Sequence, residues 1–392
     1  MAYLLIAVGT LLVLFTLVDT FFTVLNYNQR GLFFNRFLRW QWKGAHWIAR
    51  GFPTAIRRPF YRSLTGLTLV SGIGLWVAGI VGGFSLVYLG AIQLGHLKVE
   101  SGAPGGLVGG IYLSIAQFAT VGADGLSPQV SWVSVVSAIE TLFSVLFLSL
   151  VIAFLINIFN SIEALRTLCA CFPNSTTRVT LNVDSLIPYL PVEEPTSLEE
   201  HLATTRSSMN GYFDSIAADH SALYFYSGKD RFSMPFAVYM VAGTITGIQY
   251  GLPPQHPKSK VPELIRLKDS FEGVRSQMYY LLRWKEPEKV SPLGADEFTA
   301  CAVRAAQIGD ASRDRDYVSR FVSLRQSVSE MAELPPPSDW KGEYDRYASW
   351  LSFVVLADDF IRRSSHLFDY RPELAPEIEH SAIPITDYGW AK

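Results

Sequence analysis

The chain has 392 residues, of which 49% are hydrophobic and 17% are charged, and its formal net charge at pH 7 is −2. This composition fits a membrane domain joined to a soluble one, and a net charge so near zero gives no general attraction to nucleic acid. Its three cysteines, Cys169, Cys171 and Cys301, lack the paired spacing of a zinc site and are too few for a disulfide framework, so we expect neither.

Three stretches are long and apolar enough to cross a bilayer, whose hydrocarbon core takes about 20 residues of helix. The first runs from about Tyr3 to Leu25 without a basic leader or a convincing cleavage site. We therefore expect a retained transmembrane helix within residues 1–30 rather than a signal peptide. Its acidic residue, Asp19, is costly at membrane depth. We expect Asp19 to pair with the basic segment that follows or to reach water, which is a structural role.

Residues 31–65 form a basic and aromatic connector that we expect to lie on the membrane surface. Loops rich in Lys and Arg stay on the cytoplasmic side, so the connector is expected there and the N-terminus outside. Its aromatic residues suit the headgroup region beside anionic lipid, and a surface connector is favoured over a lipid-sensing switch. Between the first two apolar stretches the cationic residues are Arg30, Arg36, Arg39, Lys43, Arg50, Arg57, Arg58 and Arg62, and the aromatic ones include Phe33, Phe34, Phe37, Trp40, Trp42 and Trp47.

Residues 66–162 are expected to form one membrane domain, which begins with a second apolar stretch from about Leu67 to Ile92. Gly79 and Gly83, four residues apart, would allow close contact with another helix. A shorter apolar stretch from about Gly109 to Ala119 cannot span a bilayer but is long enough for a re-entrant helix. Non-helical backbone at membrane depth persists only when it is buried in protein or lines water. The loop after this short helix is therefore expected to need neighbouring subunits.

That loop carries six residues suited to binding ions: Thr120, Val121, Gly122, Ala123, Asp124 and Gly125. In a cation-selective loop, backbone carbonyls and a threonine hydroxyl replace the hydration shell of the ion. With Leu126, Ser127 and Pro128 after it, the loop resembles the filter of the potassium-channel superfamily. That filter reads Thr-Val-Gly-Tyr-Gly-Asp and commonly continues with an aliphatic residue, Ser and Pro. The resemblance covers roughly residues 66–162 and implies a homotetramer, because a superfamily pore uses four such loops and each chain supplies one.

The upper half of the loop departs from the superfamily pattern. Ala123 stands where the family has a tyrosine that braces the filter, and Asp124 and Gly125 reverse the usual order. This half resembles the sodium-and-potassium-conducting bacterial channels, whose filter reads Thr-Val-Gly-Asp-Gly, with an additional alanine here. The resemblance implies K⁺ and Na⁺ as permeant ions, with a weak preference for K⁺ and no organic cofactor.

Each residue of the loop receives an expected role from this comparison. The Thr120 hydroxyl and the carbonyls of Thr120, Val121 and Gly122 would form the inner coordination sites. Family filters alternate between right- and left-handed backbone, and Asp tolerates the left-handed region better than most residues, so we expect Asp124 to occupy the place of a glycine. Four Asp124 carboxylates would then crowd the outer mouth, concentrate cations and offer a site for a divalent ion.

The third apolar stretch, from about Trp132 to Phe159, is expected to line the cavity below the filter. Ser137, Thr141 and Ser144 fall on one helical face, and this polar stripe either faces water or bonds to the backbone of its own helix. Glu140 lies about two turns into the helix, near the depth of the filter. We expect it to hydrogen-bond behind the pore helix and to hold the loop in shape.

Residues 163–392 are expected to form a helical cytoplasmic domain without a Rossmann-type strand pattern or glycine-rich turn. His201 and His220 are isolated and are expected to be surface or packing residues. The uncharged stretch from Phe232 to Leu252 could cross a membrane, but its proline and polar residues favour a buried central helix. Helices are expected at Thr196 to Tyr226, Pro262 to Trp284, Ala295 to Ile308, Asp314 to Ala332 and Lys341 to Arg363.

Taken together, the sequence predicts an all-α membrane protein with a tetrameric potassium-channel-like pore domain, an extra N-terminal transmembrane helix and a helical cytoplasmic domain. The expected function is that of a cation channel in the inner membrane of a bacterium. Its expected partners are other copies of the same chain, in a homotetramer, and membrane lipids. A non-conducting membrane receptor or scaffold, which keeps the pore fold while its C-terminal domain binds a partner, is the alternative. No catalytic constellation is visible, so we do not expect an enzyme.

Overall fold

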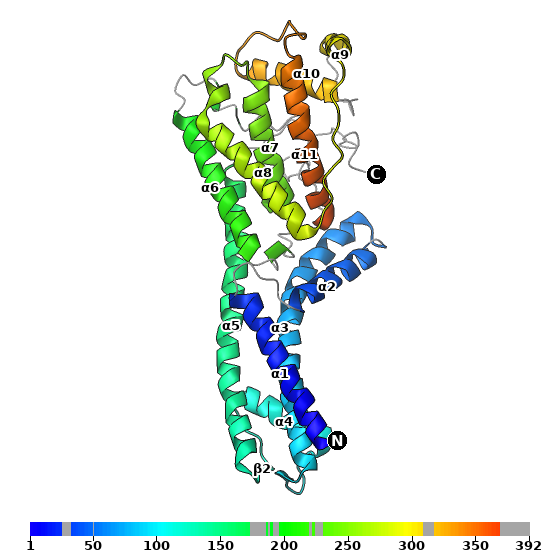
Figure 1. Ribbon diagram of the computed structural model, residues 1–392, viewed down its shortest axis with the longest axis vertical. Coiled ribbons are helices and arrows are strands. Elements are labelled where there is room, and N and C mark those ends of the chain that lie inside the picture. Colours follow the sequence, from blue (N-terminus) through cyan, green and yellow to red (C-terminus); the bar gives the residue numbers. More distant parts are fainter. Residues whose placement is uncertain are drawn as a thin grey trace. The chain divides into compact units, whose positions relative to one another are not determined.

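In the computed structural model the chain forms two compact units, both of them mainly helical (Figure 1). Unit 1 comprises Met1–Ser161 with Ser215–Phe225, and unit 2 comprises Ile162–Asp214 with Tyr226–Lys392. The structure describes residues 1–25, 33–49, 51–172, 186, 189–190, 196–218, 222–223, 230–308 and 317–368.

Unit 1 contains the three helices that are long and apolar enough to cross a membrane among the described residues. They coincide with the three apolar stretches of the sequence, but two are longer than expected. The second begins at Thr54, so the last third of the predicted connector is helical, and the third runs on to Ala170 into unit 2. The helices of unit 1 are α1 (Ala2–Leu25), α2 (Phe34–Ala49), α3 (Thr54–Gln93), α4 (Gly106–Phe118) and α5 (Ser131–Ala170).

Helices α1 and α3 run antiparallel and meet through glycines. A Cβ atom built on Gly83 would lie 2.6 Å from Val13 Cγ2 and 2.9 Å from the Gly9 carbonyl oxygen. At Gly79 it would lie 2.4 Å from Thr16 Oγ1. Small residues at such a crossing let two backbones approach closely, which is how helices without a hydrophobic driving force associate in lipid. The close contact expected at Gly79 and Gly83 is therefore present, with α1 as the partner.

A matched pair of substitutions tests this crossing. Gly83→Ala is expected to destabilise unit 1 by about 1–3 kcal/mol, because the added methyl overpacks a tight contact. Gly82→Ala is the control, since a Cβ there meets nothing within 4 Å, and alanine gains up to about 1 kcal/mol in helix propensity. Thermal unfolding of the detergent-solubilised protein measures both, and equal midpoints for the two variants would contradict the crossing.

Asp19 fixes the end of α1 to the start of α2. Its buried carboxylate accepts the backbone N–H of Phe33 at 2.7 Å and of Phe34 at 3.2 Å, and the indole N–H of Trp76 at 3.1 Å. Asp19 thus pairs with the connector, but through backbone amides at a helix N-terminus, where a negative charge is stabilised, rather than through basic side chains. Three hydrogen bonds offset the cost of burying this charge.

Trp76 is the aromatic centre of unit 1. Its ring stacks on Phe34 of α2 with 4.3 Å between centroids and meets Phe154 of α5 edge-on at 5.5 Å. Phe147, also on α5, lies 6.5 Å from the same ring. Such aromatic pairs contribute about 0.5–1.5 kcal/mol each beyond the burial of their area. One residue of α3 therefore ties the connector and the last apolar helix together.

Unit 2 is a helical domain arranged around α7 (Met234–Ile245), which continues into the π-helical turn η4 (Thr246–Gly251). Almost every residue of this segment is buried, which confirms the predicted central helix of the 232–252 stretch. The surrounding helices are α6 (Thr196–Ala218), α8 (Pro262–Leu282), α9 (Ala295–Ile308), α10 (Tyr317–Met331) and α11 (Tyr344–Phe368), with short 3₁₀ turns at η3 (Asp230–Phe232) and η5 (Pro257–Lys260).

The bounds of these helices follow the sequence prediction closely, and α9 has the expected bounds. The clearest difference is α6, which ends at Ala218 rather than near Tyr226, and Tyr226 itself lies outside the described residues. The expected start of α10 at Asp314 also lies outside them.

Buried arginines close the end of the central helix. The Arg325 guanidinium donates to the carbonyl of Gly251 and pairs with Glu343 at 3.0 Å. Arg346 donates to the carbonyl of Leu252 at 2.9 Å and lies 3.3 Å from Glu343. The last carbonyls of a helix have no partner within it, so these two guanidinium groups satisfy acceptors that burial would otherwise leave unpaired.

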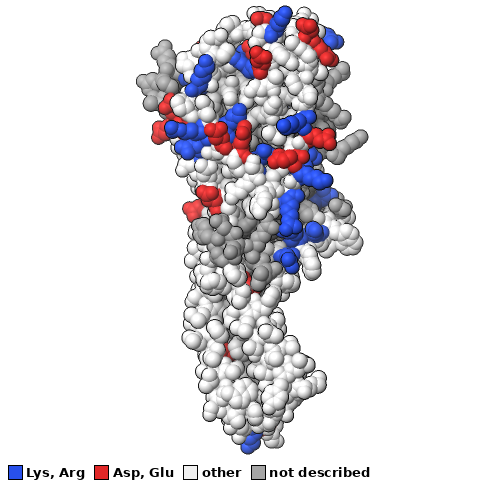
Figure 2. Space-filling view, viewed as in Figure 1, with Lys and Arg blue, Asp and Glu red and all other residues white. Residues whose placement is uncertain are grey.

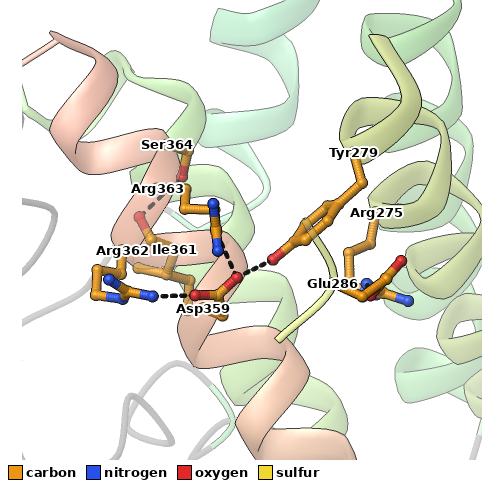
Figure 3. A network of polar contacts seen from close by, with 8 residues as sticks. All are labelled: Arg275, Tyr279, Glu286, Asp359, Ile361, Arg362, Arg363 and Ser364. Atoms are coloured by element: carbon orange, nitrogen blue, oxygen red, sulfur yellow. Dashed lines mark hydrogen bonds and ion pairs between the residues drawn. The ribbon is translucent and has the colours of Figure 1, made fainter. Parts of the chain in front are cut away.

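A second polar network joins α8 to α11 (Figure 3). Asp359 of α11 accepts hydrogen bonds from the Tyr279 hydroxyl, from Arg362 and, at 2.6 Å, from Arg363. Burial by itself would raise the pKa of Asp359, but these hydrogen bonds outweigh it, and the pKa lies below its ordinary value. Burial raises the pKa of the Tyr279 phenol, and the neighbouring Asp359 carboxylate raises it further.

This network predicts a pH-dependent contribution to stability. Because the pKa of Asp359 is lowered on folding, the contribution is complete above about pH 4 and is lost as the pH falls through the lower folded pKa. Asp359→Asn should cost unit 2 about 2 kcal/mol at pH 7, since hydrogen bonds to a buried charge are removed. Urea unfolding at pH 7 and pH 3 measures this, with exposed Asp269→Asn on α8 as control. A gap between wild type and variant that stays constant over this range would contradict the assignment.

Candidate functional site

The candidate site is the loop between α4 and the short strand β2 (Leu126–Pro128). Helix α4 is the expected short helix, and it begins slightly earlier than predicted, at Gly106. It packs closely on α3, because a Cβ atom on Gly110 would lie 2.6 Å from the carbonyl oxygen of Ser85. Glycine at this position lets α4 rest directly on the backbone of α3 and so sets the depth at which the loop begins.

The loop backbone switches hand along the predicted filter. Thr120 has φ +59°, Gly122 has φ +76° and Gly125 has φ +76°. Asp124 does not have a positive φ, so the expectation that it occupies a left-handed glycine position is wrong. After Ala123, the next residue with a left-handed backbone is Gly125, and glycine adopts this conformation without a steric penalty. The reversed Asp-Gly order therefore displaces the conformational switch by one residue.

Hydrogen bonds turn the amide groups of the loop back toward α4. Thr120 N–H donates to the Gln117 carbonyl at 2.9 Å, and both Val121 and Gly122 donate to the Ala116 carbonyl, at 3.0 and 3.3 Å. No described residue donates a hydrogen bond to the carbonyl oxygens of Thr120, Val121 and Gly122, or forms one with the Thr120 hydroxyl. The donors of this segment are thus used within the chain, and its oxygens remain available.

These residues are exposed in the single chain. Thr120, Val121, Gly122 and Asp124 are all accessible, and the apolar Val121 side chain is 77% exposed. Ala123 is half-buried. The loop is therefore open to contact from outside the single chain.

A two-stranded sheet, which was not predicted from the sequence, holds the far end of the loop. Strand β1 (Leu97–Val99) pairs antiparallel with β2, and the Glu100 N–H extends the ladder to the Gly125 carbonyl at 2.9 Å. A Cβ on Gly125 would lie 2.7 Å from Ala103 Cβ, so a larger residue does not fit there. The sheet brings the segment before α4 against the segment after the loop, and both ends of the loop are thereby fixed.

Glu140 of α5 is buried against α3 and α4. Its carboxyl group accepts the Tyr88 hydroxyl of α3 at 2.6 Å and the Ser114 hydroxyl of α4 at 2.5 Å, and it is 0% exposed. One side chain of α5 therefore joins all three helices that surround the loop. Tyr88 and Ser114 were not singled out from the sequence, although both are polar groups within apolar helices.

The polar stripe of α5 bonds mainly to its own helix. Ser144 is buried and donates to the Thr141 carbonyl at 2.7 Å. Thr141 donates to the Ser137 carbonyl at 3.1 Å and also reaches the side-chain oxygen of Gln117 on α4, again at 3.1 Å. The sequence left open whether these hydroxyls face water or bond to the backbone of their own helix, and Ser144 does the second. Thr141 and Gln117 additionally link α5 to the last turn before the loop.

Other candidate groups are dispersed. Among the described residues no group of three or more His, Cys, Asp or Glu side chains could hold a metal ion, and the three cysteines are free thiols. His201 stacks on Tyr189 with 4.6 Å between ring centroids, and burial lowers its pKa, as is typical of a packing residue. His220 lies outside the described residues.

No protein-family model, curated protein or solved structure matches this chain. The geometry of the loop and its surroundings therefore carries the inference about function.

Proposed function

We propose that the chain is one subunit of a homotetrameric cation channel, in which the loop from Thr120 to Gly125 forms the selectivity filter. The observation that carries this proposal is the combination of alternating backbone hand and unpaired carbonyl oxygens over Thr120, Val121 and Gly122. Cations lose their hydration shell only where several such oxygens converge, and a single loop supplies too few. Four copies around an axis would complete the coordination.

The exposed apolar surface near the loop supports assembly. Large apolar side chains remain uncovered on the α4 and α5 helices of one chain, and in a tetramer neighbouring subunits or lipid would cover them. They include Val108, Ile111, Ile115, Leu142 and Leu146. The buried contacts of Glu140 support the same proposal, because a filter must be held rigidly and Glu140 joins α3, α4 and α5 directly behind it.

The permeant ions in this proposal are K⁺ and Na⁺. Ala123 carries no bulky ring to brace the upper filter, so the inner oxygens of Thr120, Val121 and Gly122 would do most of the selecting. Asp124 is exposed in the single chain and, at the outer mouth of such a filter, would draw cations, including a divalent ion, toward the entrance. The excess of Arg and Lys in the connector favours a cytoplasmic position for α2, and the filter would then face outside, in the inner membrane of a bacterium.

Reversal potentials test the ion preference. Purified protein in planar bilayers with K⁺ on one side and Na⁺ on the other should give a reversal potential within about 30 mV of zero, which corresponds to a permeability ratio below about three. A shift of more than about 60 mV, a tenfold preference at one charge per ion, would contradict weak selectivity while leaving the channel itself in place.

The second candidate function is a non-conducting receptor or scaffold. The altered residues Ala123 and Asp124 favour it, because both lie where the related filters keep a bulky or flexible residue. It predicts a folded tetramer that gives no current in the same bilayers. Restoring the family residues with Ala123→Tyr and Asp124→Gly would then be the route to recover conduction.

A further inference from the structure

Helix α2 has two different apolar faces. One is buried: Phe34 stacks on Trp76, and Trp42 stacks on Tyr61 with 5.7 Å between ring centroids. This face already attaches α2 to α3. The remaining surface of the helix is therefore free to contact something outside the fold.

That remaining surface exposes two tryptophans. Trp40 is 68% exposed and Trp47 is 75% exposed, and they lie seven residues apart, so they share one side of the helix, opposite the buried face. Phe33, another seven residues back, is also exposed just before the helix. Rings of this size are rarely left in water at such regular spacing, since burying each one is worth more than about 1.5 kcal/mol of transfer free energy.

Cationic side chains lie beside this aromatic line. Arg36, Arg39 and Lys43 are exposed, and within the described part of the chain none of them forms an ion pair. The sequence contains no acidic residue between Asp19 and Glu100, and Asp19 is occupied by its three hydrogen bonds. The positive charge of this surface is therefore not neutralised within its own segment, and Figure 2 shows Lys and Arg side chains without Asp or Glu among them in the region of α2. We call Arg36, Arg39, Trp40, Lys43 and Trp47 together the outer face of α2.

The anchoring of α2 sets its depth. Asp19 binds its first turn to the end of α1, and α3 begins five residues after α2 ends. Both neighbours contain candidate membrane spans, Ala2–Leu25 and Pro59–Gln93, so with these spans in a bilayer the helix would stand near the boundary where the hydrocarbon ends. Amphipathic side chains with a ring and cations with long stems are the groups that bind at this boundary, the rings at headgroup level and the charges on phosphate.

We propose that the outer face of α2 is a binding surface for anionic phospholipid, with Trp40 and Trp47 at the level of the headgroups and Arg36, Arg39 and Lys43 on the lipid phosphates. This proposal rests on α1 and α3 crossing the membrane, and it does not depend on conduction. Charge complementarity selects an anionic lipid over a zwitterionic one, because each cation near an anionic surface favours binding about fivefold.

Lipid retention tests the charged part. Full-length protein is purified from mixed vesicles containing phosphatidylglycerol and phosphatidylcholine, and the retained lipids are counted by native mass spectrometry. Wild type should retain phosphatidylglycerol preferentially. The variant Arg36→Gln, Arg39→Gln, Lys43→Gln should lose that preference about a hundredfold, which is the product of three fivefold effects. The control Lys285→Gln, Lys289→Gln, Lys341→Gln removes the same charge from exposed positions of unit 2 and should leave it unchanged.

A retained preference in the first variant, or an equal loss in the control, would overturn the proposal. Quenching by phospholipid brominated near the headgroup gives an independent arm. The double variant Trp40→Phe, Trp47→Phe should lose a clear share of the fluorescence that the brominated lipid quenches in wild type. If the lipid quenched wild type and this variant equally, a protein surface, such as a second copy of the chain, would cover Trp40 and Trp47 instead. Because both residues are exposed, neither replacement disturbs the core.

Discussion

Glu140→Ala is expected to lower the free energy of unfolding of the membrane unit by about 2–5 kcal/mol and to abolish cation current. The substitution removes the acceptor of the buried Tyr88 hydroxyl and one of the two acceptors of Ser114, which keeps the Val81 carbonyl at 3.1 Å, and an unsatisfied buried donor costs about 1–3 kcal/mol. It also removes one of the side-chain links between α4 and α5 and leaves the Thr141–Gln117 contact to hold them together. Thermal unfolding in detergent and currents in planar bilayers measure the two effects.

Two companion variants make this prediction specific. Glu140→Gln keeps one acceptor oxygen and should fall between wild type and Glu140→Ala in stability. Ser149→Ala is the control on the same helix, since Ser149 is exposed and bonds only to the carbonyl of Val145 in its own helix. If Glu140→Ala were no less stable than Ser149→Ala, Glu140 would have no bracing role.

Gly122→Ala is expected to reduce cation current at least tenfold while leaving the fold intact. Gly122 has φ +76°, a left-handed conformation that costs a non-glycine residue about 1–2 kcal/mol, and the proposed filter would incur that cost four times. A Cβ there meets nothing within 4 Å in the single chain, so the monomer should fold normally. The backbone would instead relax to negative φ, and its carbonyl would turn away from the ion path.

Gly105→Ala is the matched control for that substitution. Gly105 lies before α4 with φ −103°, and a Cβ there also meets nothing within 4 Å. Single-channel currents and thermal midpoints of the two variants should therefore differ only in conduction. Unaltered current through Gly122→Ala would show that ions do not depend on this carbonyl.

Features that depend on hydrophobicity along the chain could be predicted from the sequence. The three apolar helices, the short helix before the loop and the central helix of residues 232–252 follow from stretches whose length and polarity leave few alternatives. The position of Glu140 behind α4 also follows, because a carboxyl group at membrane depth has to find donors, and the nearest polar groups lie on the helices beside it.

Features that depend on pairing between distant segments could not. The β1 and β2 strands are three residues each, too short to show a period, and only their antiparallel pairing reveals them. The sheet fixes Gly125 in the left-handed conformation, and Asp124 before it keeps a negative φ. Aligning the loop with the family filter one residue at a time therefore predicted the left-handed position one residue too early. Asp19 found backbone amides rather than arginine side chains, since the start of α2 was not visible in composition.

Flux of K⁺ from liposomes tests the central claim most directly. Wild-type protein reconstituted at a few tetramers per vesicle should release trapped K⁺ well above the rate of protein-free vesicles, in exchange for external Na⁺, because the oxygens of Thr120, Val121 and Gly122 would converge around a dehydrated cation. Vesicles that hold folded, tetrameric wild-type protein and yet retain K⁺ as long as empty ones would contradict the channel.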